Sequence, residues 1–317
     1  MTRQARRKAP HEPIARWIRG ELARHPPRAK SLVVTVWGDA IAPHGGAVWL
    51  GSLIRLMAPL GLNERLVRTS VYRLTREGWL AAQQDGRRSL YRLTPAGMQR
   101  FEHASRRIYA PPSNDWDGRW EIVLTPPTKL TAPKRRHVKR ELGWEGFGEI
   151  APGVFLRPSH TRAEASLADV LAALDAEHAA VVLEGREAPG VATSSLRAYA
   201  PGCWDLRRVA TEYRAFLTRF DGLVEHFRGA RAGDPEQAFV VRSLLIHAFR
   251  RVMLHDPQLP AELSPPGWPA PRAYALCHDL YRLTLRGAEE HLGATLDAAG
   301  GALPRTAPYF HERFGGL

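Results

Sequence analysis

Three glycine-containing turns in the first third of the chain constrain most strongly what it can fold into. Apolar residues have helical spacing over 48–60, and Gly61 ends that helix. Asn63 is a good N-cap for a second helix over 64–77, because its side chain can accept a hydrogen bond from the first turn. A further glycine ends this helix, and an Asp-Gly turn at 85–86 joins two strand-like segments. This order of elements predicts a winged helix-turn-helix domain.

The second helix is the predicted recognition helix. Its apolar face, Leu66, Ser70, Val71 and Leu74, would pack on the preceding helix, and the remaining arc is basic and polar. Guanidinium groups can bridge phosphates or pair with guanine edges. The predicted DNA-binding residues on this helix and on the following turn, with Ser70 counted in both sets, are Arg65, Arg68, Thr69, Ser70, Tyr72, Arg73, Arg87 and Arg88. A solvated arginine-rich face is the alternative.

The positive charge of the chain is concentrated in the same region. Residues 1–110 carry 20 basic and 7 acidic side chains, whereas residues 111–317 carry 25 of each, so the whole net charge of +13 lies in the first third. Such segregation is typical of an attached domain that binds a polyanion. A cationic surface without a partner is the alternative.

The middle segment begins after a proline-containing linker at 109–115. Strand-like and helical patterns follow one another in the order βαββαβ between Trp116 and Leu183, which predicts a small ferredoxin-like domain. Dimers often form at the edge or face of such a sheet. The basic run from Lys134 to Arg140 belongs to a solvated helix face or contacts nucleic acid. A second boundary is predicted at 190–202.

The last segment is predicted to be helical, with a loosely held tail over 300–317. The chain is therefore expected to be α+β, with a winged-helix domain and basic N-terminal extension at 1–110, a ferredoxin-like dimerisation domain at 111–195, and a helical effector domain at 196–317. The two cysteines, Cys203 and Cys277, cannot build a disulfide framework, and no apolar run is long enough to span a bilayer. We expect a cytoplasmic protein without a membrane partner.

Several motifs along nearly the whole chain resemble the PaaX family, repressors of phenylacetic acid degradation. They are Gly38-Asp39, His44-Gly45-Gly46, Leu60-Gly61-Leu62-Asn63-Glu64-Arg65-Leu66-Val67-Arg68-Thr69, Trp116-Asp117-Gly118-Arg119-Trp120, Leu245-Ile246-His247-Ala248-Phe249-Arg250-Arg251, His255-Asp256-Pro257 and Trp268-Pro269. The resemblance implies a winged-helix domain, a Cas2-like middle domain and a helical C-terminal domain. It also implies a homodimer that binds double-stranded operator DNA and is released by phenylacetyl-CoA, with no cofactor.

One rival class is a binding module without an effector, such as an architectural DNA protein. The other is an enzyme, in particular a metal-dependent nuclease or RNA-processing enzyme built on the Cas2-like domain. Metal-dependent cleavage needs a carboxylate at the end of the first strand, but that strand ends Leu124-Thr125-Pro126-Pro127. The chain also has no GxSxG, HExxH or P-loop motif. We therefore predict a repressor with no catalytic residue and no metal site.

The predicted effector site lies in the last segment. An acyl-CoA carries phosphates that need cationic partners, and one helical pattern offers several of them beside apolar residues. The predicted effector-binding residues are Arg242, His247, Arg250 and Arg251. The alternative is that these arginines are solvated or paired within the protein.

Overall fold

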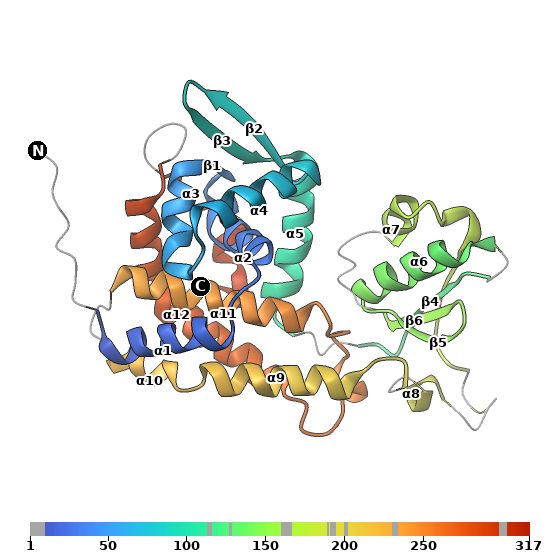
Figure 1. The fold of residues 1–317 in the computed structure, drawn as a ribbon. Coiled ribbons are helices and arrows are strands. Elements are labelled where there is room, and N and C mark those ends of the chain that lie inside the picture. The colour runs from blue at the N-terminus through green and yellow to red at the C-terminus, as the bar shows by residue number, and fades with distance from the viewer. Residues whose placement is uncertain are drawn as a thin grey trace, which may run out of the picture. The chain divides into compact units, whose positions relative to one another are not determined.

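The computed structural model of the chain (Figure 1) describes residues 10–112, 116–126, 129–159, 167–188, 190, 195–199, 202–229, 234–297 and 303–317. By its internal contacts the chain divides into two compact units. Unit one comprises 1–110, 216–250 and 272–317, and unit two comprises 111–215 and 251–271. The helical last third thus contributes to both units, and the three predicted domain ranges stay a prediction.

Some of the predicted segments fall outside the described residues. These are the start of the basic extension (1–9), the end of the first linker (113–115) and much of the second boundary (191–194 and 200–201). None of the helices in the described ranges is long and apolar enough to cross a membrane.

The first part of unit one, over the described residues 10–110, contains five α-helices and three strands. Their bounds are α1 Glu12–Arg24, α2 Ala29–Val36, β1 Ala47–Trp49, α3 Leu50–Met57, α4 Glu64–Arg76, β2 Leu80–Asp85, β3 Arg88–Leu93 and α5 Pro95–Tyr109. The helix predicted from residue 48 begins only at Leu50, because Val48 and Trp49 pair with β3 as a short strand. The helix, turn, helix, strand, turn, strand order that follows is as predicted.

The turn between α3 and α4 forms as the sequence predicts. Gly61 has a φ of +81°, in the left-handed region that a glycine adopts without strain. The Asn63 side chain accepts a hydrogen bond of 2.9 Å from the amide of Leu66, which confirms the predicted N-cap. The strands form one antiparallel sheet in the order β1-β3-β2, with Asp85 opposite Arg88 at the tip of the β2–β3 hairpin.

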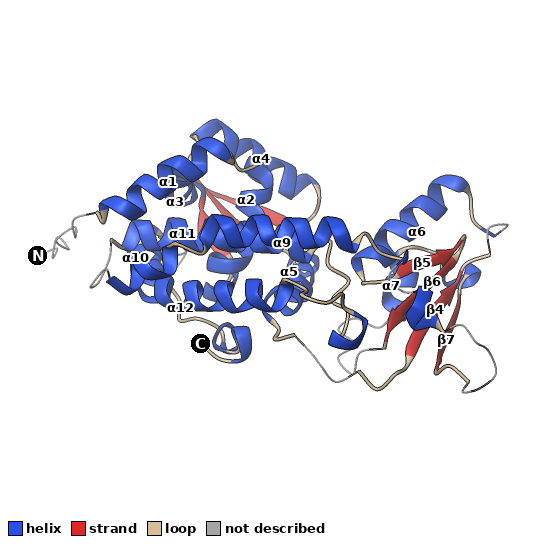
Figure 2. Cartoon of the chain, turned by 90° about the horizontal axis from the view of Figure 1, so that it is seen from below, coloured by secondary structure: helices blue, strands red, loops and turns tan. Residues whose placement is uncertain are grey.

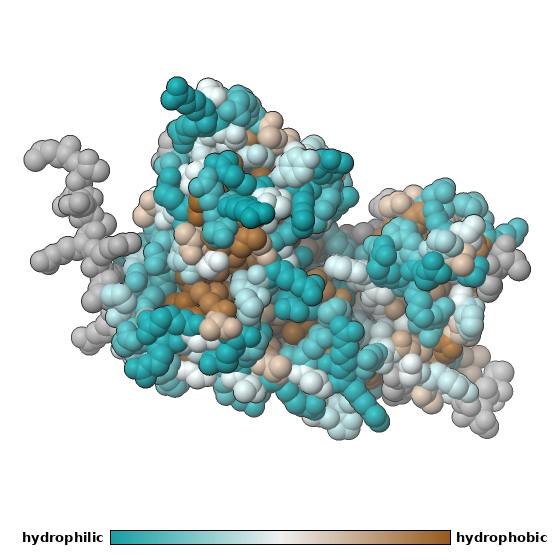
Figure 3. Space-filling view, in the orientation of Figure 1, coloured by the Kyte–Doolittle hydropathy of each residue, from teal (hydrophilic) through white to brown (hydrophobic). Residues whose placement is uncertain are grey.

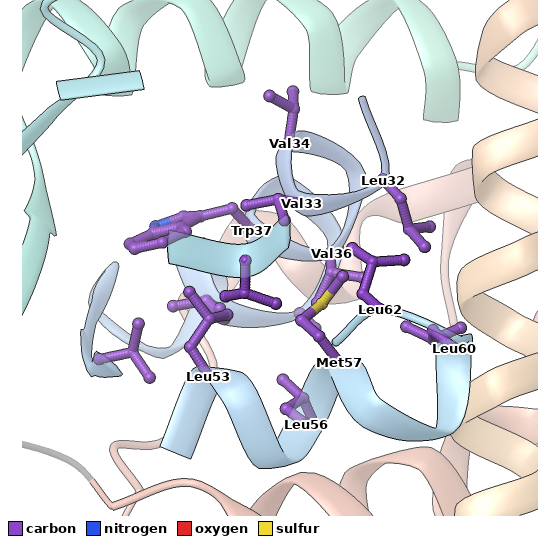
Figure 4. Close-up of a cluster of buried hydrophobic side chains, with 14 of the residues drawn as sticks. Leu32, Val33, Val34, Val36, Trp37, Leu53, Leu56, Met57, Leu60 and Leu62 are labelled. Carbon is purple, nitrogen blue, oxygen red and sulfur yellow. The ribbon is translucent and has the colours of Figure 1, made fainter. Parts of the chain in front are cut away.

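One apolar core holds these helices. Leu32, Val33 and Val36 of α2 share this core with Leu53 and Met57 of α3, and Figure 4 shows these residues within the cluster. The core continues into α4 and into two later helices; its members there are Val67, Val71, Leu74, Phe239, Val240, Leu244, Ala288 and Leu292. Burial of the inner face of α4 fixes which of its residues face solvent.

The last third of the chain is helical, as predicted. Its helices are α8 Leu196–Tyr199, α9 Leu206–Phe220, α10 Leu223–Gly229, α11 Pro235–Met253, α12 Ala270–Thr295 and α13 Pro308–His311. The expectation of a loosely held tail is wrong for 303–317, because Phe310, Arg313 and Phe314 are buried.

Unit two carries the predicted βαββαβ order. Its elements are β4 Trp120–Leu124, α6 Ala132–Trp144, β5 Gly148–Ala151, β6 Val154–Pro158, α7 Leu167–Ala173 and β7 Val181–Gly185. The sheet (Figure 2) is antiparallel throughout, in the order β5-β6-β4-β7, which is the ferredoxin-like arrangement. Val138 and Leu142 of α6 and Leu171 of α7 share one core with Val123 and Phe155 of the sheet.

Candidate nucleic-acid interface

The exposed face of α4 carries the predicted basic arc. Six side chains lie outward on it: Arg65, Arg68, Thr69, Tyr72, Arg73 and Arg76. Tyr72 is 61% exposed, which is unusual for an aromatic side chain unless it serves a surface. The arc therefore presents four guanidinium groups, a hydroxyl and a phenol on one helix face.

Two residues at the border of the predicted faces of this helix need separate mention. Ser70 is only 3% exposed and its hydroxyl donates a hydrogen bond of 2.7 Å to the carbonyl oxygen of Leu66, so it lies on the inner face as predicted and not on the exposed arc, and its assignment to DNA binding stays a prediction. Leu66, predicted to face inward, is 43% exposed. Val67 fills the inward position, and Leu66, one residue earlier, lies about 100° away around the helix.

The outward side chains also contact one another. The Glu64 carboxylate accepts a hydrogen bond of 2.7 Å from Arg68 Nε, one helical turn away. Thr69 Oγ1 donates to the carbonyl oxygen of Arg65 at 2.9 Å. Arg76 donates to the Tyr72 hydroxyl at 3.4 Å. These contacts are solvent-exposed and weak, so the side chains can exchange them for a ligand.

The hairpin after α4 adds two more cations. Arg87 and Arg88 are exposed at the β2–β3 tip, and the projecting end of this hairpin is hydrophilic at the top of Figure 3. The Arg88 guanidinium lies 4.2 Å from the ring centre of Trp49, a cation–π contact, and 3.9 Å from the Asp297 carboxylate. Arg87 has the freer position of the pair.

A buried polar cluster lies behind this surface in unit one, centred on Asp39 in the π-helical turn Trp37–Ile41 that continues α2. Asp39 Oδ1 accepts hydrogen bonds from the hydroxyls of Tyr109 (2.7 Å) and Tyr281 (2.9 Å). Asp39 Oδ2 accepts one of 2.9 Å from Arg242 Nε. Arg313 Nη1 donates to Asp39 Oδ1 and to its backbone oxygen, both at 3.0 Å. No pattern in the sequence indicates this cluster.

A second carboxylate completes the charge balance. Glu289 accepts a hydrogen bond of 2.7 Å from Arg242 Nη1 and contacts His44 Nε2 at 2.9 Å. Burial opposes ionisation of Glu289, but the hydrogen bond with His44 and the charge of Arg242 outweigh it and lower its pKa to about 2. Two guanidinium groups thus face two carboxylates, and the cluster ties α2, α5, α11, α12 and the Arg313–Gly315 turn together.

The predicted effector residues fall into different environments. Arg242 is 0% exposed and pairs with Asp39 and Glu289, which is the arrangement that the alternative of internal pairing describes, and its assignment as a ligand contact stays a prediction. His247 is buried, with Nδ1 3.0 Å from Thr35 Oγ1. Arg250 is partly buried, and Arg251 is exposed. Thr35 comes from α2, more than two hundred residues away in sequence, and no sequence pattern pointed to it.

One group of side chains that could ligate a metal ion lies in unit two. Asp175, Glu177 and His178 bring one ligand atom each within 4.8 Å of one another, but all three are exposed, and exposed acidic groups are common without an ion. The described end of β4, at Leu124 and Thr125, has no carboxylate where the nuclease alternative needs one.

Comparisons with known proteins cover nearly the whole chain. Family models match in three places: "PaaX-like protein" over 28–97, "PaaX protein central Cas2-like domain" over 113–196, and "PaaX-like protein C-terminal domain" over 204–294. The chain is 36% identical over 296 residues to "Transcriptional repressor PaaX" of Escherichia coli (strain K12), covering 92% of each protein. Among solved structures, "Uncharacterized protein Rv0674 from Mycobacterium tuberculosis" is 23% identical, with a TM-score of 0.49 over 89% of this chain and 98% of that one.

Proposed function

This chain belongs to the PaaX family, and from that membership we propose that it is a DNA-binding transcriptional repressor rather than an enzyme. The observation that carries the proposal is the exposed basic arc of α4 beside a basic hairpin, in a chain whose Escherichia coli relative is named a repressor. We propose that it controls a phenylacetate catabolic operon and that phenylacetyl-CoA releases it from the operator.

The DNA-reading part of the proposal assigns a role to each element of the candidate interface. The segment from α2 to β3 is a winged helix-turn-helix, in which α4 enters the major groove and the β2–β3 hairpin is the wing. The base-reading and phosphate-binding residues of α4 are Arg65, Arg68, Thr69, Tyr72 and Arg73. Arg87 and Arg88 contact the backbone or an adjacent minor groove.

A homodimer follows from the reading capacity of one such domain. A single recognition helix contacts too few base pairs to give nanomolar specificity, whereas a two-fold dimer doubles the site on a palindromic operator. The ferredoxin-like sheet of unit two is the proposed interface. Light scattering that showed only monomers, free and on DNA, would contradict this part.

The decisive experiment compares operator affinity of the wild type with an Arg68→Ala, Arg73→Ala variant over a range of salt concentrations. Each lost base contact is expected to weaken binding by about 5–150-fold, and each lost phosphate contact to lower the salt slope by about one. The matched control is Arg282→Ala, Arg286→Ala, which removes two exposed arginines from α12.

Two measurements test the DNA-binding role of α4 and the identity of the effector independently. If the correctly folded α4 variant binds operator as tightly as wild type at every salt concentration, the assignment of α4 is wrong. If calorimetry detects no binding of phenylacetyl-CoA to a protein that still binds its operator, the effector is wrong while the interface stands.

A further inference from the structure

Arg250 is a partly buried cation with no counter-charge among the residues that the structure describes. Burial lowers the pKa of its guanidinium, and the nearby Tyr109 phenol opposes that shift only in part. No carboxylate among the described residues lies within ion-pair distance of it, and its one hydrogen bond, to Thr35 Oγ1, is long at 3.5 Å. Leaving a desolvated charge unpaired is unfavourable, so such a group usually has a partner.

The other buried arginines of unit one have that partner. Arg242 pairs with Asp39 and Glu289, and Arg313 pairs with Asp39. Arg219, also partly buried, donates from Nε to the buried Glu21 carboxylate at 3.0 Å. In these three cases a carboxylate of the same unit neutralises the guanidinium group, whereas Arg250 has no described carboxylate within ion-pair distance.

Polar groups from two helices converge at Arg250. Thr35 donates its hydroxyl to the carbonyl oxygen of Ser31 at 3.0 Å, so its oxygen lone pairs face Arg250 Nη1 and His247 Nδ1. Thr35 belongs to α2, and both His247 and Arg250 belong to α11, one turn apart. The cluster thus offers a cation and a polar ring beside a hydroxyl, and no carboxylate in the described part of the chain forms an ion pair with the cation.

We propose that Arg250, with Thr35 and His247, binds a phosphoryl group of a small ligand. An oxyanion supplies the counter-charge that no described carboxylate provides, and the planar guanidinium matches phosphate oxygens. The inference deepens the proposed function and rests on it only for the ligand's identity, a phosphate of the acyl-CoA. Free inorganic phosphate has the same chemistry and is the second source.

The site lies next to the helices that position α4. Thr35 is one turn before Asp39 on the same helical segment, and α2 and α4 share the apolar core. Tyr109, close to Arg250, donates its hydroxyl to Asp39. A phosphoryl group at Arg250 would therefore change the electrostatic surroundings of Thr35 and Tyr109, and through α2 could bias the orientation of α4.

The test is calorimetric titration of full-length wild type, Arg250→Gln and the exposed control Arg282→Gln with phenylacetyl-CoA. We expect Arg250→Gln to weaken binding by about 10–100-fold, the usual effect of losing hydrogen bonds from a charged group. The control should stay within twofold of wild type. Operator affinity of ligand-free Arg250→Gln should also stay close to that of wild type, and the operator should no longer be released by the thioester.

A second readout separates this site from the effector's identity. Inorganic phosphate, against chloride at equal ionic strength, should raise the melting temperature of wild type more than that of Arg250→Gln. If wild type binds operator but no thioester, the proposed effector is wrong. The phosphate-dependent melting temperatures of wild type and Arg250→Gln then decide alone whether the site exists. An equal rise in both proteins shows an adventitious ion only and overturns it.

The remaining outcomes are also decisive. Unchanged thioester affinity in Arg250→Gln places the ligand elsewhere, and a loss in Arg251→Gln alone moves it to the exposed neighbour. Arg250→Gln removes an uncompensated charge, so it should melt at or above the wild-type temperature. If it does not fold, Arg250→Lys is titrated instead, and an affinity equal to wild type rejects the proposal, because lysine lacks the planar fork.

Discussion

The buried cluster around Asp39 makes a quantitative prediction for Asp39→Asn. This change keeps the side-chain shape but removes one of two carboxylates that face Arg242 and Arg313. It also replaces one of two hydrogen-bond-accepting oxygens with an amide, although every partner of Asp39 in the cluster is a donor. Breaking a buried ion pair from one side typically lowers the free energy of unfolding by about 3–5 kcal/mol.

That loss is a large part of the stability of a domain, about 5–15 kcal/mol. For 150–250 residues each kcal/mol corresponds to about 2–4 °C, so the melting temperature of unit one should fall by about 6–20 °C. The assay is urea unfolding together with scanning calorimetry. The control is Asp297→Asn, which removes an exposed pair with Arg55 and should lower the stability by about 1 kcal/mol or less. If Asp39→Asn stays within 1 kcal/mol of wild type, the cluster does not stabilise the unit as reasoned here.

Three further predictions concern single positions. The pKa of Glu289 in the folded state, about 2, lies below its usual value of 4.5, so its stabilisation is present above about pH 4.5 and is lost as the pH falls toward 2. In Glu289→Gln, the urea concentration at the unfolding midpoint should fall less steeply than in wild type as the pH is lowered. An unchanged pH dependence would reject the assignment. Gly97→Ala places a Cβ against the backbone oxygen of Trp79 and should lower the free energy of unfolding by about 1–3 kcal/mol, whereas Gly143→Ala, in open space on α6, should be neutral or stabilising by chemical denaturation. Arg88→Ala removes the contact with Trp49 and should weaken operator binding. In a salt titration, the slope of log affinity against log salt concentration should fall by roughly the amount of one phosphate contact, and Arg92→Ala is the comparison.

The parts of this molecule that sequence predicts well are those set by near neighbours in the chain. The cap at Asn63, the outward arc of α4 and the βαββαβ order all follow from residues within a few positions of one another. Where two faces of a helix meet, periodicity loses resolution, and Leu66, predicted to face inward, is exposed there. The strand β1 is so short that the sequence pattern assigned Val48 and Trp49 to the helix that follows it.

Long-range charge pairing lies beyond such reasoning. Nothing near Arg242 in sequence shows that its partner is Asp39, 203 residues earlier, so an arginine that looked available for a ligand is neutralised. The same holds for Arg313, which converts a segment expected to be loose into part of the interior. Arg250 stood in the predicted effector set for its charge alone, and its missing carboxylate is visible only in three dimensions.

The distance along the chain between Asp39 and Arg313 also sets an order of events during synthesis. The two residues are 274 positions apart. A ribosome adding about 5–20 residues per second needs about 14–55 s to cover that separation. Strands β4 to β7 of unit two are synthesised within this interval, so their sheet can be complete before Arg313, the last cationic partner of Asp39, has been added to the chain. The helices behind α4 are therefore complete late, and a nascent chain would have the exposed basic arc of α4 in its final surroundings only after Arg313 has emerged.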